Sequence, residues 1–332
     1  MKNQKENLNK FISNSIYNHN KKYALIIGET PSNGARSPKL WNRVYKKLKY
    51  QTRMYPADVK KEKLEYLINY LRSDDLFIGS AVTAPYKELI VKYLDFVSVE
   101  AKLIGSINTI KKINKKFYGF NTDYNGILKS LNFYKNKKKI LILGCGGAGK
   151  AVILASIKKF RNSFFYFFNR DKKKLSKFIN KLKIKRFEIL DNKSILTLNN
   201  IDLVINSSSI GFNSWIYRKN FFFNLRYFLP VSNLRGIKGI KNLNKKIFLK
   251  KNKILINKST LQFRTFLKNN PNSDYLDIIY NPLNTKLLKL AKIYGHKILN
   301  GIQMNFEQAV EAFCIVNNKK FDKIKKYMKK NG

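Results

Sequence analysis

The chain has 332 residues, of which 44% are hydrophobic and 14% aromatic, so it is long enough for about two domains with a sizeable core. This composition excludes disorder as the default state, and two cysteines, Cys145 and Cys314, exclude a disulfide framework. Two histidines leave little for a zinc site, and we expect no metal. No apolar run approaches the ~20 residues of a membrane-spanning helix. We therefore expect a soluble, cytoplasmic protein with no membrane partner.

The charge is the anomaly of this composition, because 67 Lys and Arg stand against 20 Asp and Glu, for a formal net charge of +47. A nucleic-acid-binding protein would concentrate its basic residues on one element and place aromatic residues among them. Here lysines are spread from Lys46 to Lys330. This spread favours a solvated surface and no specific nucleic-acid partner, and leaves binding to polyanions as a by-product.

The chain begins with a polar tail, residues 1–21, which is either a short amphipathic helix or a loose segment and lacks the apolar stretch of a signal peptide. After it, short apolar runs that predict strands alternate with segments of helical period. The main predicted strands are residues 23–27, 76–78, 139–144, 164–168 and 202–206. The main predicted helices are residues 38–48, 87–95 and 149–160.

This alternation predicts the α/β fold class, with parallel sheets and helices on both faces. Residues 215–272 are rich in lysine and aromatic residues and have weak periodicity. We interpret them as a divergent or expanded part of the second domain.

A glycine-rich turn follows the strand at residues 139–144 and opens the next helix. It reads Gly144, Cys145, Gly146, Gly147, Ala148 and Gly149. In dinucleotide-binding proteins, the first glycine of such a G-x-G-x-x-G turn allows a tight turn and the second lets a pyrophosphate approach. The third packs the helix against the strand, and the helix N-terminus offers free N–H groups to phosphate. The turn predicts a Rossmann-type dinucleotide site.

The end of the second strand of such a unit indicates which dinucleotide binds. An acidic residue there favours NAD, whereas a basic residue favours the 2′-phosphate of NADP. Arg170 and the lysines at 172–174, among them Lys174, favour NADP, whereas Asp171 favours NAD. Asp171 is also a candidate N-cap of the next helix. We expect NADP as the cofactor, with NAD as the alternative.

Several further motifs follow one another along the chain, and together with the glycine turn they resemble the shikimate dehydrogenase family. The family patterns are S-x-S-P, N-V-T-x-P-x-K, G-A-V-N-T, G-x-N-T-D, N-A-T-x-x-G, D-x-x-Y-x-P-x-x-T and G-x-x-M-x-x-x-Q-A. The matching segments are residues 35–38, 81–87, 105–109, 119–123, 206–211, 277–285 and 301–309. The matches run in order over nearly the whole chain, except the tail and residues 215–272.

The resemblance implies an enzyme in which an N-terminal α/β substrate domain and a Rossmann-type, doubly wound NADP-binding domain enclose a cleft. The substrate domain would be residues 22–123 with 301–332, and the NADP-binding domain residues 124–300. The family reversibly reduces 3-dehydroshikimate to shikimate, with hydride from NADPH. It takes a small-molecule substrate, and we expect a monomer or homodimer.

The resemblance also assigns roles to particular residues. Lys87 and Asp123 would be the catalytic pair, because an ammonium group can stabilise and protonate the ketone oxygen when hydride arrives. The substrate-binding residues would be Ser37, Thr83, Asn108, Tyr280 and Gln308. The cofactor-binding residues would be Gly144, Gly146, Gly147, Ala148, Gly149, Asn169, Arg170, Lys174 and Gly301.

Structural explanations compete with these roles. Lys87 could start a solvated helix, and Asp123 could cap the helix that continues to Leu131. Asn108 could satisfy backbone groups of a turn, and Gln308 could be an exposed helix residue.

The chain also departs from the family pattern. Ala35 replaces the first serine of S-x-S-P and Ala81 replaces the asparagine of N-V-T, so two polar groups near the substrate are lost. Each lost hydrogen bond can cost about 1–3 kcal/mol. Arg36 is a candidate replacement charge for a substrate carboxylate. The alternatives are therefore quinate or a related cyclic hydroxy acid as substrate, or a degenerate relative that binds nucleotide or polyanions without catalysis.

Overall fold

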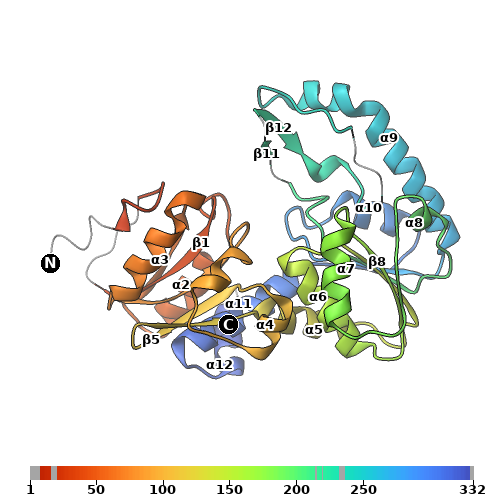
Figure 1. Cartoon of the computed structure of the whole chain (residues 1–332). Coiled ribbons are helices and arrows are strands. Elements are labelled where there is room, and N and C mark those ends of the chain that lie inside the picture. The colour runs from red at the N-terminus through yellow and green to blue at the C-terminus, as the bar shows by residue number, and fades with distance from the viewer. Residues whose placement is uncertain (1–7, 16–20, 214, 219, 232–235, 330–332) are drawn as a thin grey trace. The chain divides into compact units, whose positions relative to one another are not determined.

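The structure is a computed structural model of the chain that describes residues 8–15, 21–213, 215–218, 220–231 and 236–329 (Figure 1). It divides into two compact units. The first comprises Met1–Gly126 and Phe306–Gly332, and the second Ile127–Asn305. Among the described residues, no helix is long and apolar enough to cross a membrane.

The first unit contains a six-stranded mixed sheet with the order β2-β1-β3-β5-β6-β4. Its strands are β1 (Tyr23–Gly28), β2 (Arg53–Asp58), β3 (Phe77–Val82), β4 (Phe96–Val97), β5 (Thr109–Ile113) and β6 (Lys116–Phe120). The expected parallel pairing is confirmed for β1 with β2 and β3 and for β4 with β6, whereas β5 pairs antiparallel with both β3 and β6. The antiparallel pairing of β5 with β6 follows from the two-residue turn at Asn114 and Lys115, whose φ angles of 47° and 63° suit a tight hairpin.

Helices cover both faces of this sheet. They are α2 (Ser37–Lys47), α3 (Leu64–Ser73), α4 (Val99–Ile104), α11 (Ile302–Asn317) and α12 (Phe321–Met328). Successive side chains of β1 point to opposite faces, so Leu25 and Ile27 pack with α3 while Ala24 and Ile26 pack with α2 and α11. The helix expected at residues 87–95 is wrong. That segment is a turn followed by a short 3₁₀ helix, Leu89–Tyr93. A second 3₁₀ turn of this unit, Lys61–Lys63, directly precedes α3.

Part of the N-terminal tail packs against the first unit. Leu8 is buried in the same apolar cluster as Leu25. Asn14 donates a hydrogen bond to the Pro56 carbonyl at 2.9 Å and accepts one from the Asp58 N–H at 2.7 Å. Residues 8–14 therefore add to the edge of the sheet at β2, while the rest of the tail lies mostly outside the described residues.

The second unit contains a six-stranded sheet with the order β14-β13-β10-β7-β8-β9, and every pairing in it is parallel. Its strands are β7 (Lys139–Leu143), β8 (Phe164–Phe168), β9 (Phe187–Ile189), β10 (Leu203–Asn206), β13 (Asp274–Asp277) and β14 (Ile298–Asn300). When these strands are numbered 1 to 6 in chain order, the sheet read from β9 to β14 has the order 3-2-1-4-5-6, which is that of doubly wound dinucleotide-binding folds. The α/β expectation is confirmed here.

The helices of this unit are α6 (Gly147–Lys159), α7 (Lys172–Lys181), α8 (Ser194–Thr197), α9 (Lys245–Asn269) and α10 (Lys286–Ile293), and α5 (Thr122–Leu131) enters it from the first unit. Leu141 and Leu143 of β7 pack with α9 and α10, whereas the alternating Ile140 and Ile142 are buried on the opposite face. The segment interpreted as an expanded part of the domain forms an antiparallel pair, β11 (Trp215–Arg218) and β12 (Phe221–Asn224), a 3₁₀ turn at Leu225–Tyr227, and α9.

Candidate active site

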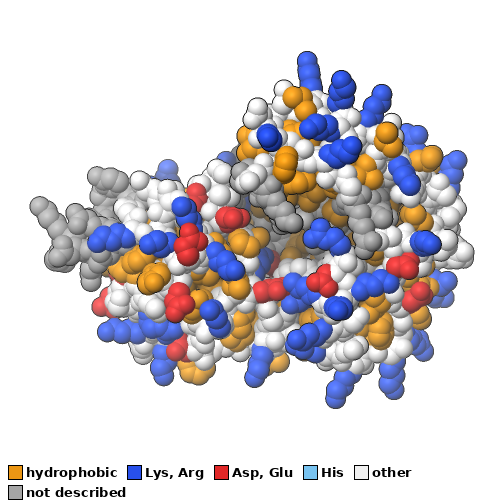
Figure 2. All heavy atoms as spheres, turned by 45° about the horizontal axis from the view of Figure 1, so that its top comes forward, with side chains coloured by type: hydrophobic (Ala, Val, Ile, Leu, Met, Phe, Trp, Pro, Cys, Tyr) orange, Lys and Arg blue, Asp and Glu red, His pale blue; other side chains and the backbone are white. Residues whose placement is uncertain are grey.

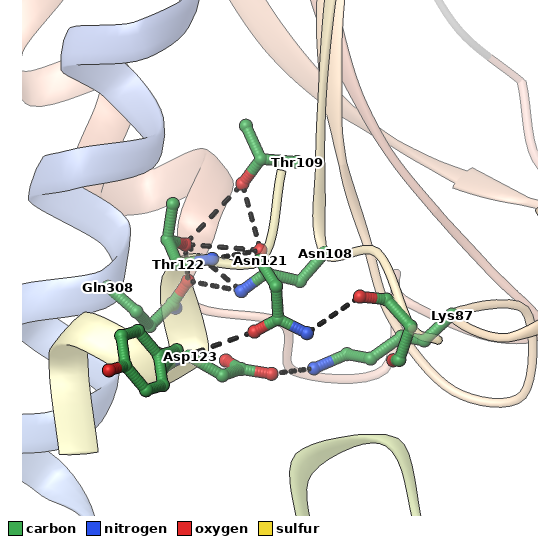
Figure 3. Close-up of polar contacts among 9 residues, drawn as sticks. Lys87, Asn108, Thr109, Asn121, Thr122, Asp123 and Gln308 are labelled. Atoms are coloured by element: carbon green, nitrogen blue, oxygen red, sulfur yellow. Dashed lines mark hydrogen bonds and ion pairs between the residues drawn. The ribbon is translucent and has the colours of Figure 1, made fainter. Parts of the chain in front are cut away.

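An ion pair joins two elements of the first unit. Lys87 lies in the turn that follows β3, and its Nζ is 2.5 Å from Oδ2 of Asp123 in the first turn of α5 (Figure 3). The Asp123 side chain is 7% exposed, whereas the Lys87 side chain keeps 19%. The explanation of Lys87 as a solvated helix-start residue is therefore wrong, because it is bonded to a nearly buried carboxylate. The N-terminal turn of α5 is capped by Asn121, whose side chain accepts from the Tyr124 N–H at 3.3 Å.

A buried amide network lies next to this pair. The Oδ1 of Asn108 accepts hydrogen bonds from the Thr122 N–H at 2.7 Å and the Thr109 hydroxyl at 3.1 Å. The Nδ2 of Asn108 donates to the Thr122 hydroxyl at 3.0 Å and to Oε1 of Gln308 at 3.4 Å. Because the oxygen is held by donors, the orientation of the amide is set, with its N–H groups on the Gln308 side (Figure 3).

This geometry decides between the explanations offered for two residues. Asn108 does satisfy a backbone N–H, at the start of α5, so the structural explanation is correct without excluding a role in binding. Gln308 is half-buried and bonded to Asn108 and Thr122, so it is not an exposed helix residue. Thr109 and Thr122 were missed by the sequence reasoning, although both stand within motifs that it quoted.

Two further predicted substrate-binding residues of this unit, Ser37 and Thr83, lie in the segments that follow β1 and β3. Ser37 is the first residue of α2 and is 8% exposed, and Thr83 directly follows β3, where its N–H donates to the Ile27 carbonyl at 2.9 Å. Ala81 belongs to the apolar cluster under α2 and α11, and Ala35 packs against that cluster. Both departures from the family pattern therefore place methyl groups in apolar surroundings.

The glycine turn of the second unit connects β7 to α6. Gly144 has a φ of +105°, and a Cβ there would lie 2.8 Å from the Ser208 N, so only glycine fits. A Cβ on Gly149 would lie 2.8 Å from the Gly144 carbonyl oxygen, which shows how closely α6 approaches the turn. A Cβ on Gly146 would meet nothing within 4 Å. The turn thus leaves open space at its second glycine.

This turn fits the phosphates of a dinucleotide. Gly146 is the N-cap of α6 and gives no side-chain cap, and Gly147 and Ala148 begin the helix without an acidic residue in the first turn. The first N–H groups of a helix have no partner within it, and with the helix dipole they attract anions. The open space at Gly146 and these donors therefore match a pyrophosphate.

The residues after β8 are held close to this turn. The Asn169 side chain accepts from the Cys145 N–H at 3.2 Å and donates to the Asp171 carbonyl at 2.9 Å. Asp171 caps α7 by accepting from the Lys174 N–H at 2.9 Å, as expected of an N-cap. Its carboxylate is thus engaged, whereas the Arg170 side chain is exposed.

Two other predicted residues of the second unit have different surroundings. A Cβ on Gly301 would lie 1.8 Å from the Ile278 carbonyl oxygen, so glycine is required there by backbone packing alone. Tyr280 is half-buried in the loop after β13.

The sequence reasoning missed a buried carboxyl group beside this loop. Asp277 is fully buried and accepts hydrogen bonds from Asn206 at 3.1 Å, from the Ile279 N–H at 3.0 Å and from Thr285 at 2.7 Å. Burial raises the pKa of the Asp277 carboxyl to about 7, although these hydrogen bonds lower it. The only sequence signal was its place in the D-x-x-Y-x-P-x-x-T motif. The Asn206 oxygen also accepts from the Ser208 N–H at 3.1 Å, so Asp277 is connected to the residue that packs on Gly144.

The second unit has a Rossmann-type sheet with a dinucleotide turn, and the first unit is an α/β unit that carries a lysine paired with a nearly buried carboxylate. Together these features define a nicotinamide-dependent oxidoreductase. A model of the shikimate dehydrogenase substrate binding domain matches residues 26–110. The NADP(+)-dependent shikimate dehydrogenase of Aquifex aeolicus is 34% identical over 242 residues, which cover 72% of this chain and 71% of the relative. That of Methanococcus maripaludis is 30% identical over 307 residues, 90% of this chain and 93% of the relative.

The crystal structure of the Aquifex aeolicus shikimate dehydrogenase superposes with a TM-score of 0.67 at 26% sequence identity, covering 95% of this chain and 100% of that one. The chain belongs to the shikimate dehydrogenase family. The resemblance inferred from the sequence is confirmed.

Proposed function

We propose that the protein catalyses the NADP-dependent, reversible reduction of 3-dehydroshikimate to shikimate, a step in the biosynthesis of chorismate and the aromatic amino acids. The observation that supports this most strongly is the ion pair between Lys87 and the buried Asp123, since a protein that only binds nucleotide has no chemical need for it. The relatives that cover most of the chain are named for the same NADP-dependent reaction.

The chemistry assigned to the pair is proton transfer. When bound, NADPH would supply the hydride that reduces the carbon of the ring ketone. The ketone oxygen then gains negative charge, which the Lys87 ammonium stabilises and neutralises by donating a proton. Asp123 accepts the hydrogen bond that orients the ammonium group. In the reverse direction Lys87 takes the proton from the shikimate hydroxyl.

The other predicted residues position the reactants. The N–H side of the Asn108 amide and the neighbouring Gln308 would hold ring hydroxyls, while Ser37 and Thr83 would hold the carboxylate end of the substrate. Tyr280 is the remaining residue of the proposed substrate-binding set. We keep the domain boundaries proposed from the sequence, with residues 22–123 and 301–332 binding substrate and residues 124–300 binding NADP.

The cofactor would be held by the glycine turn and the residues after β8. Gly144, Gly146, Gly147, Ala148 and Gly149 would receive the pyrophosphate. Asn169, Arg170 and Lys174 would receive the 2′-phosphate of the adenosine ribose, and Gly301 completes the proposed set. The engagement of Asp171 in capping α7 supports NADP over NAD, because this carboxylate is committed to the Lys174 N–H.

The replacement of two polar positions by Ala35 and Ala81 favours a second candidate, the same reaction with quinate or a related cyclic hydroxy acid. The proposal also includes a cytoplasmic location and a monomer or homodimer.

The reaction is tested by following NADPH absorbance with shikimate and NADP, then with quinate, and then with NAD in place of NADP. Turnover with shikimate and NADP is the expected result. Turnover only with quinate, or only with NAD, would change the assigned substrate or cofactor and leave the proposed mechanism as it is. No turnover with any combination, in protein whose thermal unfolding is cooperative, overturns the proposal in favour of a degenerate binding protein.

A further inference from the structure

One helix of the second unit exposes apolar side chains on the face that is turned to solvent. The inner face of α9 is anchored by buried phenylalanines, among them Phe248 and Phe263. On its outer face Ile247 is 46% exposed, Ile254 85% and Leu261 66%. The inner anchors fix which face is outside, so the exposure of these three side chains is a property of the folded unit.

The three exposed side chains form a straight row. They are seven residues apart, and a heptad falls only ~20° short of two full turns of an α-helix, so they lie above one another on the crest of the outer face. At a rise of 1.5 Å per residue the row from Ile247 to Leu261 is ~21 Å long. Lys250 and Lys258 lie ~40° to either side of Ile254 around the axis. The outer face is thus an apolar crest with basic flanks.

The sequence segment that contains this face carries charges of one sign. Between Leu203 and Ser273 the sequence holds 14 Lys and Arg and no Asp or Glu. In Figure 2, Lys and Arg side chains stand out from the upper part of the second unit with hydrophobic side chains among them. Lysine is abundant along the whole chain, but a row of outward aliphatic side chains between lysines is not explained by that abundance.

We propose that the outer face of α9 binds the surface of a lipid bilayer that contains anionic lipids. The helix would lie parallel to the surface, with Ile247, Ile254 and Leu261 entering the interface and the flanking lysines reaching the acidic headgroups. This contact is peripheral and needs no spanning helix. It would revise the expectation of no membrane partner, and it is independent of the proposed reaction.

The pattern favours a bilayer over the other anionic partners. A nucleic acid would place its phosphates against the aliphatic crest, and the crest has no aromatic residue to stack on bases. An acidic helix of a partner protein would need apolar anchors at i, i+3 or i+4 and i+7. Here Lys250 and Lys251 occupy the intermediate positions after Ile247. Isolated aliphatic side chains flanked by long lysines suit a headgroup layer, which each side chain can enter separately.

The experiment measures co-sedimentation of the full chain with phosphatidylcholine vesicles, with and without phosphatidylglycerol. Binding only to the anionic vesicles, weakened by added salt, is expected. The triple variant K250Q/K251Q/K253Q should weaken binding by at least about tenfold. K60Q/K61Q/K63Q is its matched control, since these exposed lysines have the same spacing in the first unit and their loss lowers the net charge equally. This control should bind like the wild type.

A second pair of variants tests the apolar crest. Ile254→Ser should weaken binding, whereas Ile293→Ser, at a comparably exposed isoleucine that ends α10, should not. Both side chains are exposed, so thermal unfolding and dehydrogenase activity should be unchanged. If the two triple lysine variants lost vesicle binding equally, net charge alone would explain the binding, and the proposal would be overturned. Binding unaffected by Ile254→Ser, or binding to single-stranded RNA but not to anionic vesicles, would overturn it as well.

Discussion

Lys87 and Asp123 form an ion pair in which the two partners have unequal access to solvent. The carboxylate is 7% exposed, whereas the lysine side chain keeps 19%, and 2.5 Å separates the two bonded atoms. The buried partner fixes the position of the pair, and the more accessible partner is the one that a ketone oxygen must reach. This asymmetry is what a fixed proton donor requires.

Replacing Lys87 by Ala should lower kcat with shikimate by about 10²–10⁴-fold, the usual contribution of one positioned acid or base. The NADP dissociation constant, measured by titration calorimetry, should not change. Lys92→Ala is the control, because this exposed lysine lies in the same segment. A Lys87→Ala enzyme with wild-type turnover would sink the assignment of the proton donor.

Two glycines of the turn between β7 and α6 are needed for different reasons, Gly146 for cofactor binding and Gly149 for packing. The Cβ added in Gly146→Ala would meet nothing within 4 Å, so this variant should unfold at the wild-type temperature. Its KM for NADP should rise by on the order of tenfold, because the added methyl group occupies the space of the phosphates. Gly149→Ala would place its Cβ 2.8 Å from the Gly144 carbonyl oxygen and should lower the unfolding temperature itself. An unchanged KM in Gly146→Ala would place the pyrophosphate elsewhere.

Much of the second unit could be predicted because its signals are local. The strand at residues 164–168 is an apolar run bounded by polar residues, and β8 has those bounds. The helix α9 was missed because its apolar residues point in two directions. Phe263 faces the core while Ile254 faces solvent, which blurs the helical period that one-sided burial produces.

The buried networks could not be predicted because they depend on pairing distant segments. Asn108 meets Thr122 only because the hairpin between β5 and β6 returns the chain to the same place. That hairpin turn contains Lys115 where a glycine signal is usual. Asp277 was missed for a related reason, since burial by residues far along the chain leaves no mark on its immediate neighbours.

Arg36 directly precedes Ser37 at the start of α2. The residue before it is Ala35, where the family pattern has a serine hydroxyl. If the Arg36 guanidinium holds the substrate carboxylate, Arg36→Ala should raise the KM for shikimate by on the order of tenfold and leave kcat nearly unchanged. Lys39→Ala, at an exposed position of the same helix, is the control for a general loss of charge. An unchanged KM in Arg36→Ala would remove this role.

Arg170 should decide the choice of cofactor, because its side chain is exposed beyond β8 while Asp171 is engaged in capping α7. Arg170→Ala should raise the KM for NADP by about tenfold and leave the KM for NAD unchanged, since only NADP carries the 2′-phosphate. Lys173→Ala provides the comparison with a neighbouring exposed lysine. Equal changes for both cofactors would show that Arg170 does not read the phosphate.

The buried Asp277 should make stability depend on pH in an unusual direction. Its pKa is raised by burial from 3.8 to about 7 in the folded protein, so between these values the folded state holds a proton that the unfolded state has lost. Stability from this group is therefore fully present below about pH 4 and declines as the pH rises to about 7. A shift of this size corresponds to at most about 4 kcal/mol.

The variant Asp277→Asn isolates this effect, because the amide resembles the protonated acid and its Nδ2 can donate to the Thr285 hydroxyl. Denaturant unfolding at pH 5 and pH 8 should show the wild type losing stability relative to Asp277→Asn as the pH rises. The many other charged groups are common to both proteins and cancel in the comparison. Parallel pH curves for the two proteins would mean that Asp277 is already ionised in the folded state at pH 5, and its place in the network with Asn206 and Thr285 would then be that of a charged acceptor.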